Sequence, residues 1–102
     1  MFYITSMKQT AFERCFVEVV EDFARELFQE GKKKDKPYNY TSFAQAAYPE
    51  QKDATMTWVK VRCGERGISL QKANDYAIAV GKPMAELVIL AKERLRRGHC
   101  PS

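Results

Sequence analysis

Hydrophobic periodicity is strongest in the first thirty residues of the chain. Residues 1–30 carry apolar side chains at helical intervals, and most of the charged residues lie between them. The apolar positions are Phe12, Phe16, Val19, Val20, Phe23, Leu27 and Phe28. Spacings of three and four residues are typical of one face of an amphipathic helix. Thr5 or Ser6 can cap its start, and Gly31 is suited to end it, because glycine readily adopts the left-handed conformation. The pattern predicts a long helix over about residues 7–30.

Two short helices joined by a turn are predicted over residues 41–63. Ser42 and Gln45 have the spacing of a capping box, Pro49 cannot continue the first helix, and Asp53 is a favourable N-cap for the second. The first helix has small residues that allow a close helix crossing, at Ala44, Ala46 and Ala47. This is the layout of a helix-turn-helix, whose second helix enters the major groove of DNA.

Two further helices are predicted over residues 69–80 and 83–97. Ser69 can cap the first, Gly81 can end it, and Pro83 suits the first position of the next. The inner faces are expected to carry Leu70, Ala73, Tyr76, Ala77 and Val80, and then Met84, Leu87, Val88, Ala91 and Leu95. No segment alternates apolar and polar residues as a strand does. We therefore expect an all-α, five-helix domain that spans residues 1–102.

Charge is unevenly distributed along the chain. Residues 1–30 hold three basic and six acidic residues, whereas the rest of the chain holds fourteen basic and seven acidic residues, within a net charge of +4. A basic body of this kind is compatible with a polyanionic partner, although it also suits a merely soluble surface.

Cysteine usage and the absence of targeting signals indicate a cytoplasmic protein. Cys15, Cys63 and Cys100 are odd in number and share no repeated spacing, so we expect free thiols in a reducing compartment. A structural zinc site needs four ligands at paired spacings, and the chain offers only three candidates, which are Cys63, His99 and Cys100. We therefore expect no metal and no cofactor. No apolar run approaches the ~20 residues of a membrane helix, so no membrane partner is expected.

Catalytic chemistry has little support in the sequence. The chain has one histidine, no glycine-rich phosphate loop, and no nucleophile beside a base at a known spacing. We expect no catalytic residues and no enzyme activity.

Several short motifs resemble a known family over about half of the chain. They are Phe43-Ala44, Ile68-Ser-Leu-Gln-Lys-Ala73, Val80-Gly81 and Glu86-Leu87-Val88. In this order they resemble the Cro/phage-repressor helix-turn-helix family, which has the lambda-repressor-like fold. The resemblance implies a five-helix DNA-binding domain, and the periodicity adds a long helix at its N-terminal end.

The expected DNA contacts lie on and around the helix at residues 54–63. With Met56 and Val59 expected to face inward, the outward residues and their neighbours are Gln51, Lys52, Asp53, Thr55, Thr57, Trp58, Lys60, Arg62 and Arg66. The threonines suit bases or phosphates, and the basic residues suit phosphates. Trp58 stands where the family has a polar, base-contacting residue, and its alternative place is against a neighbouring helix. In that case the helix is rotated and Lys60 gains importance.

These observations favour a sequence-specific regulator that binds double-stranded DNA. We expect a phage- or prophage-type repressor that occupies an operator as a homodimer, since two recognition helices then enter grooves about 34 Å apart. The helices around residues 12–28 and 84–95 are the expected dimer surfaces. The alternative is an adaptor or antitoxin-like module that does not bind DNA and in which Trp58 and the aromatic first helix bind protein.

Overall fold

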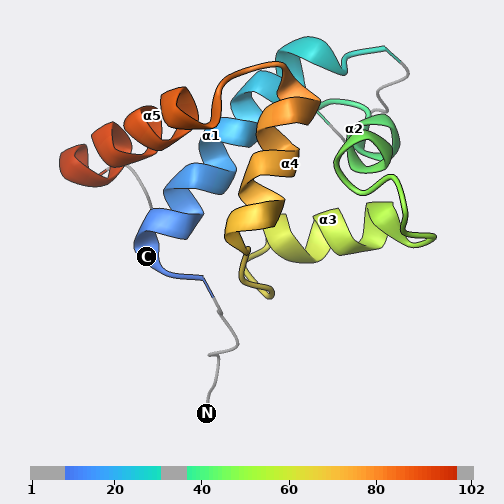
Figure 1. Ribbon diagram of the computed structural model, residues 1–102, viewed down its shortest axis with the longest axis horizontal. Helices are drawn as coiled ribbons and strands as arrows, with labels where there is room; N and C mark the ends of the chain where they lie inside the picture. The colour runs from blue at the N-terminus through green and yellow to red at the C-terminus, as the bar shows by residue number, and fades with distance from the viewer. Residues whose placement is uncertain (1–8, 31–36, 99–102) are drawn as a thin grey trace.

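The computed structural model describes residues 9–30 and 37–98, which form five α-helices and no strand. The helices are α1 (Ala11–Leu27), α2 (Tyr40–Ala47), α3 (Ala54–Arg62), α4 (Leu70–Val80) and α5 (Met84–Arg97). Helix α1 packs mainly against α5, while α2 packs against α3 and α4. In Figure 1, α5 lies at the left, α2 and α3 lie at the right, and α4 runs between them. The prediction of an all-α, five-helix fold is confirmed.

Helix α1 begins later than the periodicity predicts. Thr10 is its N-cap, because its hydroxyl accepts a hydrogen bond from the Glu13 amide (3.1 Å) and the Glu13 carboxylate accepts one from the Thr10 amide (2.8 Å). This reciprocal capping box satisfies two amides that the helix itself cannot. The expected caps Thr5, Ser6 and Gly31 lie outside the described residues.

Helix α2 also begins at a different cap from the one expected. The Asn39 carboxamide oxygen accepts from the Ser42 amide (3.1 Å), so Ser42 lies inside the first turn and the predicted capping box with Gln45 is wrong. Asn39 also donates from its side chain to the Glu30 carbonyl (2.9 Å) and from its amide to the Phe28 carbonyl (2.6 Å). One asparagine thus caps α2 and binds it to the end of α1.

The caps predicted for α4 are confirmed. The Ser69 hydroxyl accepts from the Lys72 amide (3.0 Å), and Gly81 ends the helix in the left-handed region at φ +69°. Pro83 is the N-cap of α5 and not its first residue. Leu70 is 76% exposed, contrary to expectation, because it lies at the end of the helix and at the edge of its buried face.

Aromatic rings fill the centre of the core. The Phe43 ring centroid lies 4.6 Å from that of Trp58 and 5.5 Å from that of Phe28, and Tyr76 closes the group at 5.5 Å from Trp58. Phe16, Val19, Val20 and Leu87 extend the core between α1 and α5. Most of the apolar face predicted for α1 therefore packs inside the molecule, but Leu27 is 58% exposed, contrary to expectation.

The cysteines differ from the expectation of three free thiols. Cys15 is disulfide-bonded, whereas Cys63 is a free and exposed thiol. Cys100 lies outside the described residues. The cysteine pattern thus no longer argues for a reducing compartment. None of the described helices is long and apolar enough to cross a membrane.

Candidate nucleic-acid interface

Helices α2 and α3, which we expected to form a helix-turn-helix, lie at one edge of the molecule (Figure 1). Helix α2 ends at Ala47, and α3 begins at Ala54. The intervening turn is closed by a hydrogen bond from the Gln51 amide to the Tyr48 carbonyl (3.1 Å) and by one from the Thr57 hydroxyl to the Gln51 side-chain oxygen (3.0 Å). Asp53 occupies the N-cap position without a side-chain capping bond. Helix α3 packs on α2 and α1 and lies at the lower right of Figure 1.

Helix α3 is rotated relative to the sequence-based expectation. Its buried side carries Ala54, Thr57, Trp58 and Val61. Met56 is 57% exposed, so its predicted inward position is wrong, as are the outward positions predicted for Thr57 and Trp58. Val59 is only partly buried at the margin of the core. Burial of a tryptophan removes more apolar surface from water than burial of a methionine, which favours this rotation.

Trp58 occupies the alternative place expected for it, inside the core. Its side chain is 0% exposed, and its indole N–H donates to the Tyr38 hydroxyl (2.7 Å). Burial raises the pKa of Tyr38, and the neighbouring charge of Glu21 raises it further. The tyrosine therefore stays neutral and serves as a polar partner for a buried ring.

Arg62 is held by a buried carboxylate on α1. Its Nε lies 2.6 Å from the Glu21 carboxylate, which also accepts from the Tyr38 hydroxyl (2.9 Å), and its guanidinium lies 4.9 Å from the centre of the Tyr40 ring. Burial lowers the pKa of Arg62, but the hydrogen bond and charge of Glu21 outweigh it, and the pKa is raised. Arg62 thus joins α3 to α1 through Glu21, and its guanidinium is already paired within the molecule.

Two polar residues near the start of α1 bind the end of α3. The Gln9 side chain donates to the carbonyls of Val61 and Arg66, both at 2.7 Å, and accepts from Arg14 (3.1 Å). Arg14 also donates to the Arg62 carbonyl (3.0 Å). The Arg62 carbonyl is one of those that the end of a helix leaves without an intrahelical partner, whereas the Val61 carbonyl also accepts from the Gly64 amide. Sequence reasoning missed Gln9 and Arg14, since more than forty residues separate them from their acceptors.

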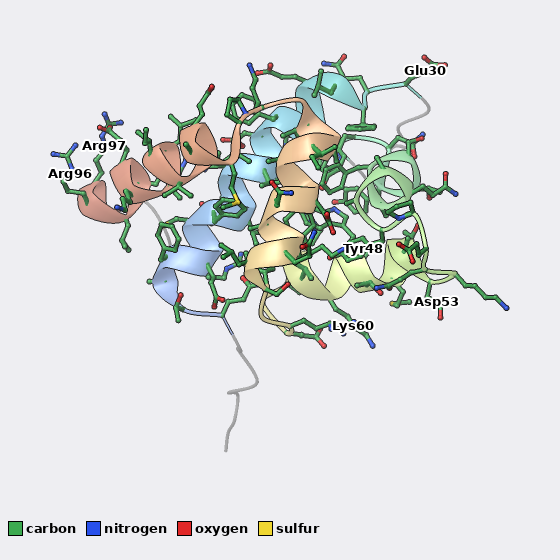
Figure 2. The ribbon with its side chains drawn as sticks, in the orientation of Figure 1. Glu30, Tyr48, Asp53, Lys60, Arg96 and Arg97 are labelled. Atoms are coloured by element: carbon green, nitrogen blue, oxygen red, sulfur yellow. The ribbon has the colours of Figure 1, made fainter. Side chains whose placement is uncertain are left out.

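The opposite side of α3 is accessible to a partner. Lys52, Asp53, Met56 and Lys60 are exposed at helical spacing, and Figure 2 places Asp53 and Lys60 along the lower edge of the molecule. Thr55 is partly exposed and lies 3.4 Å, hydroxyl to hydroxyl, from Thr41. Met56 is the member of this surface that the sequence reasoning placed in the core. We call this surface the α3 outer face, and it consists of Lys52, Asp53, Thr55, Met56 and Lys60.

The remaining expected contacts lie beside this face. Arg66 is exposed in the loop after α3, and Gln51 is exposed in the turn before it, although its side chain is bound to Thr57. Compared with known proteins, the chain matches no family model, no curated protein and no solved structure. The resemblance to the Cro/phage-repressor family stays a prediction, and the function is inferred from the α3 outer face.

Proposed function

We propose that the protein is a sequence-specific regulator that binds double-stranded DNA by inserting the α3 outer face into the major groove. The observation that supports this proposal is that α3 has one buried side and one exposed side. One side is buried through Trp58 and Val61, while Met56 and Lys60 are exposed on the other. The exposure of these two side chains shows that no described helix covers them. In this proposal the domain is a lambda-repressor-like helix-turn-helix and acts by occupying an operator.

The α3 outer face offers contacts of both kinds that DNA recognition needs. The Thr55 hydroxyl, which donates to Thr41, can accept from a base edge, and the Met56 thioether can pack on a thymine methyl group. Lys52 and Lys60 carry ammonium groups suited to phosphates on either side. Asp53 lies between them and would disfavour a phosphate at its own position. Thr57, Trp58 and Arg62 have no place in this proposed surface because they are buried or bound internally.

Rigid attachment of α3 supports a role in recognition. Glu21 binds Arg62 and Tyr38 binds Trp58 along the helix, and Gln9 binds its last turn. A helix that is already ordered loses less conformational entropy when it enters a groove. The contacts from α1 and from Tyr38 therefore favour a preorganised reading helix.

The proposal is tested by measuring duplex binding at several salt concentrations. Duplexes selected from a random pool would be titrated with wild type, Lys60→Ala and the control Lys92→Ala, which removes an exposed charge from α5. Loss of one phosphate contact should reduce the salt slope of log K by about one unit for Lys60→Ala only. Thr55→Ala and Met56→Ala should instead change which duplexes are preferred, at about 1–3 kcal/mol per lost base contact.

Absence of saturable duplex binding by wild type would overturn the proposal. Equal salt slopes for the two lysine variants would also contradict it, because α3 would then contribute no phosphate contact. The alternative of a protein adaptor was expected to use Trp58 and the aromatic face of α1. Trp58 is buried, and most of that face lies in or against the core.

A further inference from the structure

A polar hollow lies between the turn before α3, the helix itself and the start of α4. Its volume is about 210 Å³. Val61 and Ile68 supply apolar parts of its lining, and the polar side chains are Tyr48, Gln51, Thr57, Arg66, Ser69 and Lys72. Two of them are cations, and none is acidic. The hollow is separate from the α3 outer face, because Thr57 belongs to the buried side of that helix.

Proton counting at two buried tyrosines leaves one donor unused. The hydroxyls of Tyr48 and Tyr76 are hydrogen-bonded to each other, and the side chains are 4% and 0% exposed. One hydrogen bond uses one of the two hydroxyl protons, and no other described residue accepts from either hydroxyl. Tyr48 lines the hollow and Tyr76 does not. Both hydroxyl protons have a place to donate if Tyr76 donates to Tyr48 and Tyr48 donates into the hollow.

Positive charge borders the same hollow. Arg66 is exposed and forms no ion pair with any residue that the structure describes. Arg66 and Tyr48 line the same hollow. Burial raises the pKa of Tyr48, and the charge of Arg66 acts against that rise. Lys72 forms another wall, with its ammonium 4.0 Å from the centre of the Tyr48 ring.

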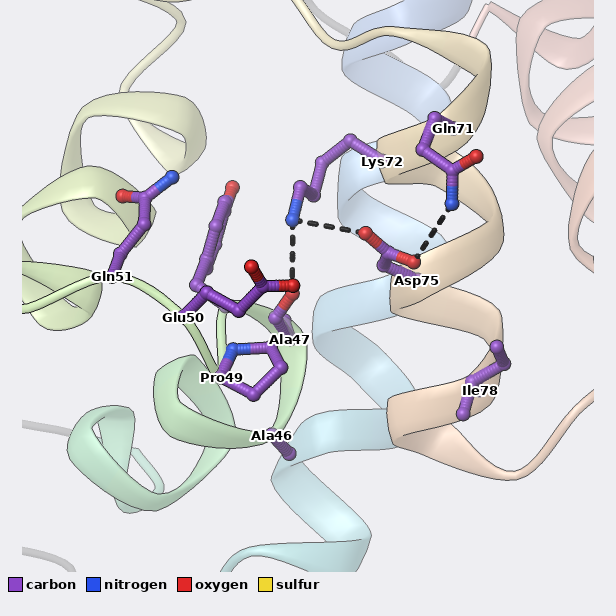
Figure 3. Close-up of a pocket in the computed structure, with 10 residues that line it drawn as sticks. Ala46, Ala47, Pro49, Glu50, Gln51, Gln71, Lys72, Asp75 and Ile78 are labelled. Carbon is purple, nitrogen blue, oxygen red and sulfur yellow. Dashed lines mark hydrogen bonds and ion pairs between the residues drawn. The ribbon is translucent and has the colours of Figure 1, made fainter.

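Lys72 keeps part of its donor capacity. Its ammonium donates to the Ala47 carbonyl (3.0 Å) and pairs with the Asp75 carboxylate (3.0 Å), as the dashed lines in Figure 3 show. An ammonium has three protons, so one remains. Asp75 neutralises much of the charge of Lys72, and the uncompensated charge at the hollow is therefore that of Arg66.

We propose that this hollow binds an oxyanion of the phosphate class, with Arg66 and the Tyr48 hydroxyl as its principal donors. Arginine suits such a group because its planar fork can donate two parallel hydrogen bonds to it. The remaining proton of Lys72 and the Ser69 hydroxyl complete the donor set. The oxyanion comes either from a backbone phosphate of bound DNA, which rests on the proposed function, or from a free phosphorylated small molecule.

The test is a titration of the full chain with inorganic phosphate, followed by amide chemical shifts. Saturable shifts are expected at Gly67, Ser69 and Lys72. Arg66→Gln should weaken phosphate binding by about tenfold or more, as expected for loss of a charge-assisted hydrogen bond. The control Lys92→Gln removes one positive charge from α5 and should stay within about twofold of wild type, because exposed charges at a distance are screened.

A pair of tyrosine variants isolates the unused proton. Tyr48→Phe and Tyr76→Phe both remove the hydrogen bond between the two rings, so both lose stability through the same contact. Only Tyr48→Phe removes the donor that faces the hollow. Phosphate binding should weaken in Tyr48→Phe and persist in Tyr76→Phe, and thermal unfolding of each variant with and without phosphate gives the same comparison if one of them is marginally stable.

The results separate the two sources and define failure. If a duplex displaces phosphate from the hollow, the source is the DNA backbone; if both bind together, it is a free oxyanion. Shifts that never saturate, equal weakening in Arg66→Gln and Lys92→Gln, or equal weakening in the two tyrosine variants would overturn the inference. The phosphate titration contains no DNA, so its failure and the failure of the proposed function are observed independently.

Discussion

At the scale of single residues, the identity of Trp58 decides how α3 faces the rest of the molecule. Its ring packs between Phe43 and Tyr76, and its N–H is satisfied by Tyr38. Met56, two residues earlier, projects from the other side and is 57% exposed. A buried aromatic side chain thus fixes the rotation, and a flexible thioether is left on the surface.

Truncation of these two side chains should therefore have unequal effects on stability. Trp58→Ala removes a fully buried ring and should lower the free energy of unfolding by about 3–5 kcal/mol. Met56→Ala should change it by no more than about 0.5 kcal/mol, as is usual for a surface substitution. Urea unfolding measures both. Comparable losses in the two variants would show that α3 is not rotated as described.

At the scale of elements, the crossing of α2 and α4 depends on small residues. Ala44 on α2 is 0% exposed and Ala77 on α4 is 2% exposed, and the two helices pack on each other. An added side chain at either site has no space unless the helices separate. Ala46, on the same helix as Ala44, is exposed and provides a matched control.

Leucine at these positions should distinguish a tight crossing from a loose one. Ala44→Leu and Ala77→Leu should each destabilise the fold by about 1–3 kcal/mol through overpacking. Ala46→Leu should be close to neutral, because leucine and alanine have similar helix propensities and the site faces solvent. Thermal unfolding of the three variants checks this. If the two core variants melt at the wild-type temperature, the crossing is looser than the structure indicates.

At the scale of the whole molecule, the surfaces available for a second copy are fewer than the sequence suggests. The aromatic face of α1 and the inner face of α5 were the expected dimer surfaces, and they pack against each other. On the outer face of α5, away from Leu87 and Ala91, Ile89 is still 61% exposed. Leu95, which we expected on the inner face, is 40% exposed near the end of the helix. The proposed homodimer is therefore assigned to the outer face of α5.

Charge substitution at this face should weaken self-association. In a symmetric dimer each substitution occurs once in each copy, so Ile89→Asp places two carboxylates at the contact. Their repulsion should shift the protein toward monomer. Ile78→Asp is the control, because Ile78 is similarly exposed (70%) but lies on α4. Sedimentation with and without a palindromic duplex measures the change. Wild type that remains monomeric under both conditions would remove the homodimer from the proposal.

The sequence alone determined features that depend on neighbours within one or two helical turns. The five helices, the Ser69 cap and the Gly81 end of α4 follow from spacing and backbone preference, and the structure has them. Local chemistry also misled at Ser42, because the better-placed Asn39 caps α2 while it binds the end of α1.

Only the tertiary structure decided which side of α3 is exposed. Apolar residues lie on both sides of this nine-residue helix, with Met56 and Val59 on one and Trp58 and Val61 on the other, so periodicity cannot choose between them. The choice comes from partners far along the chain, such as Tyr38 for Trp58 and Glu21 for Arg62. A residue's burial depends on the energy of those distant contacts, which no local pattern contains.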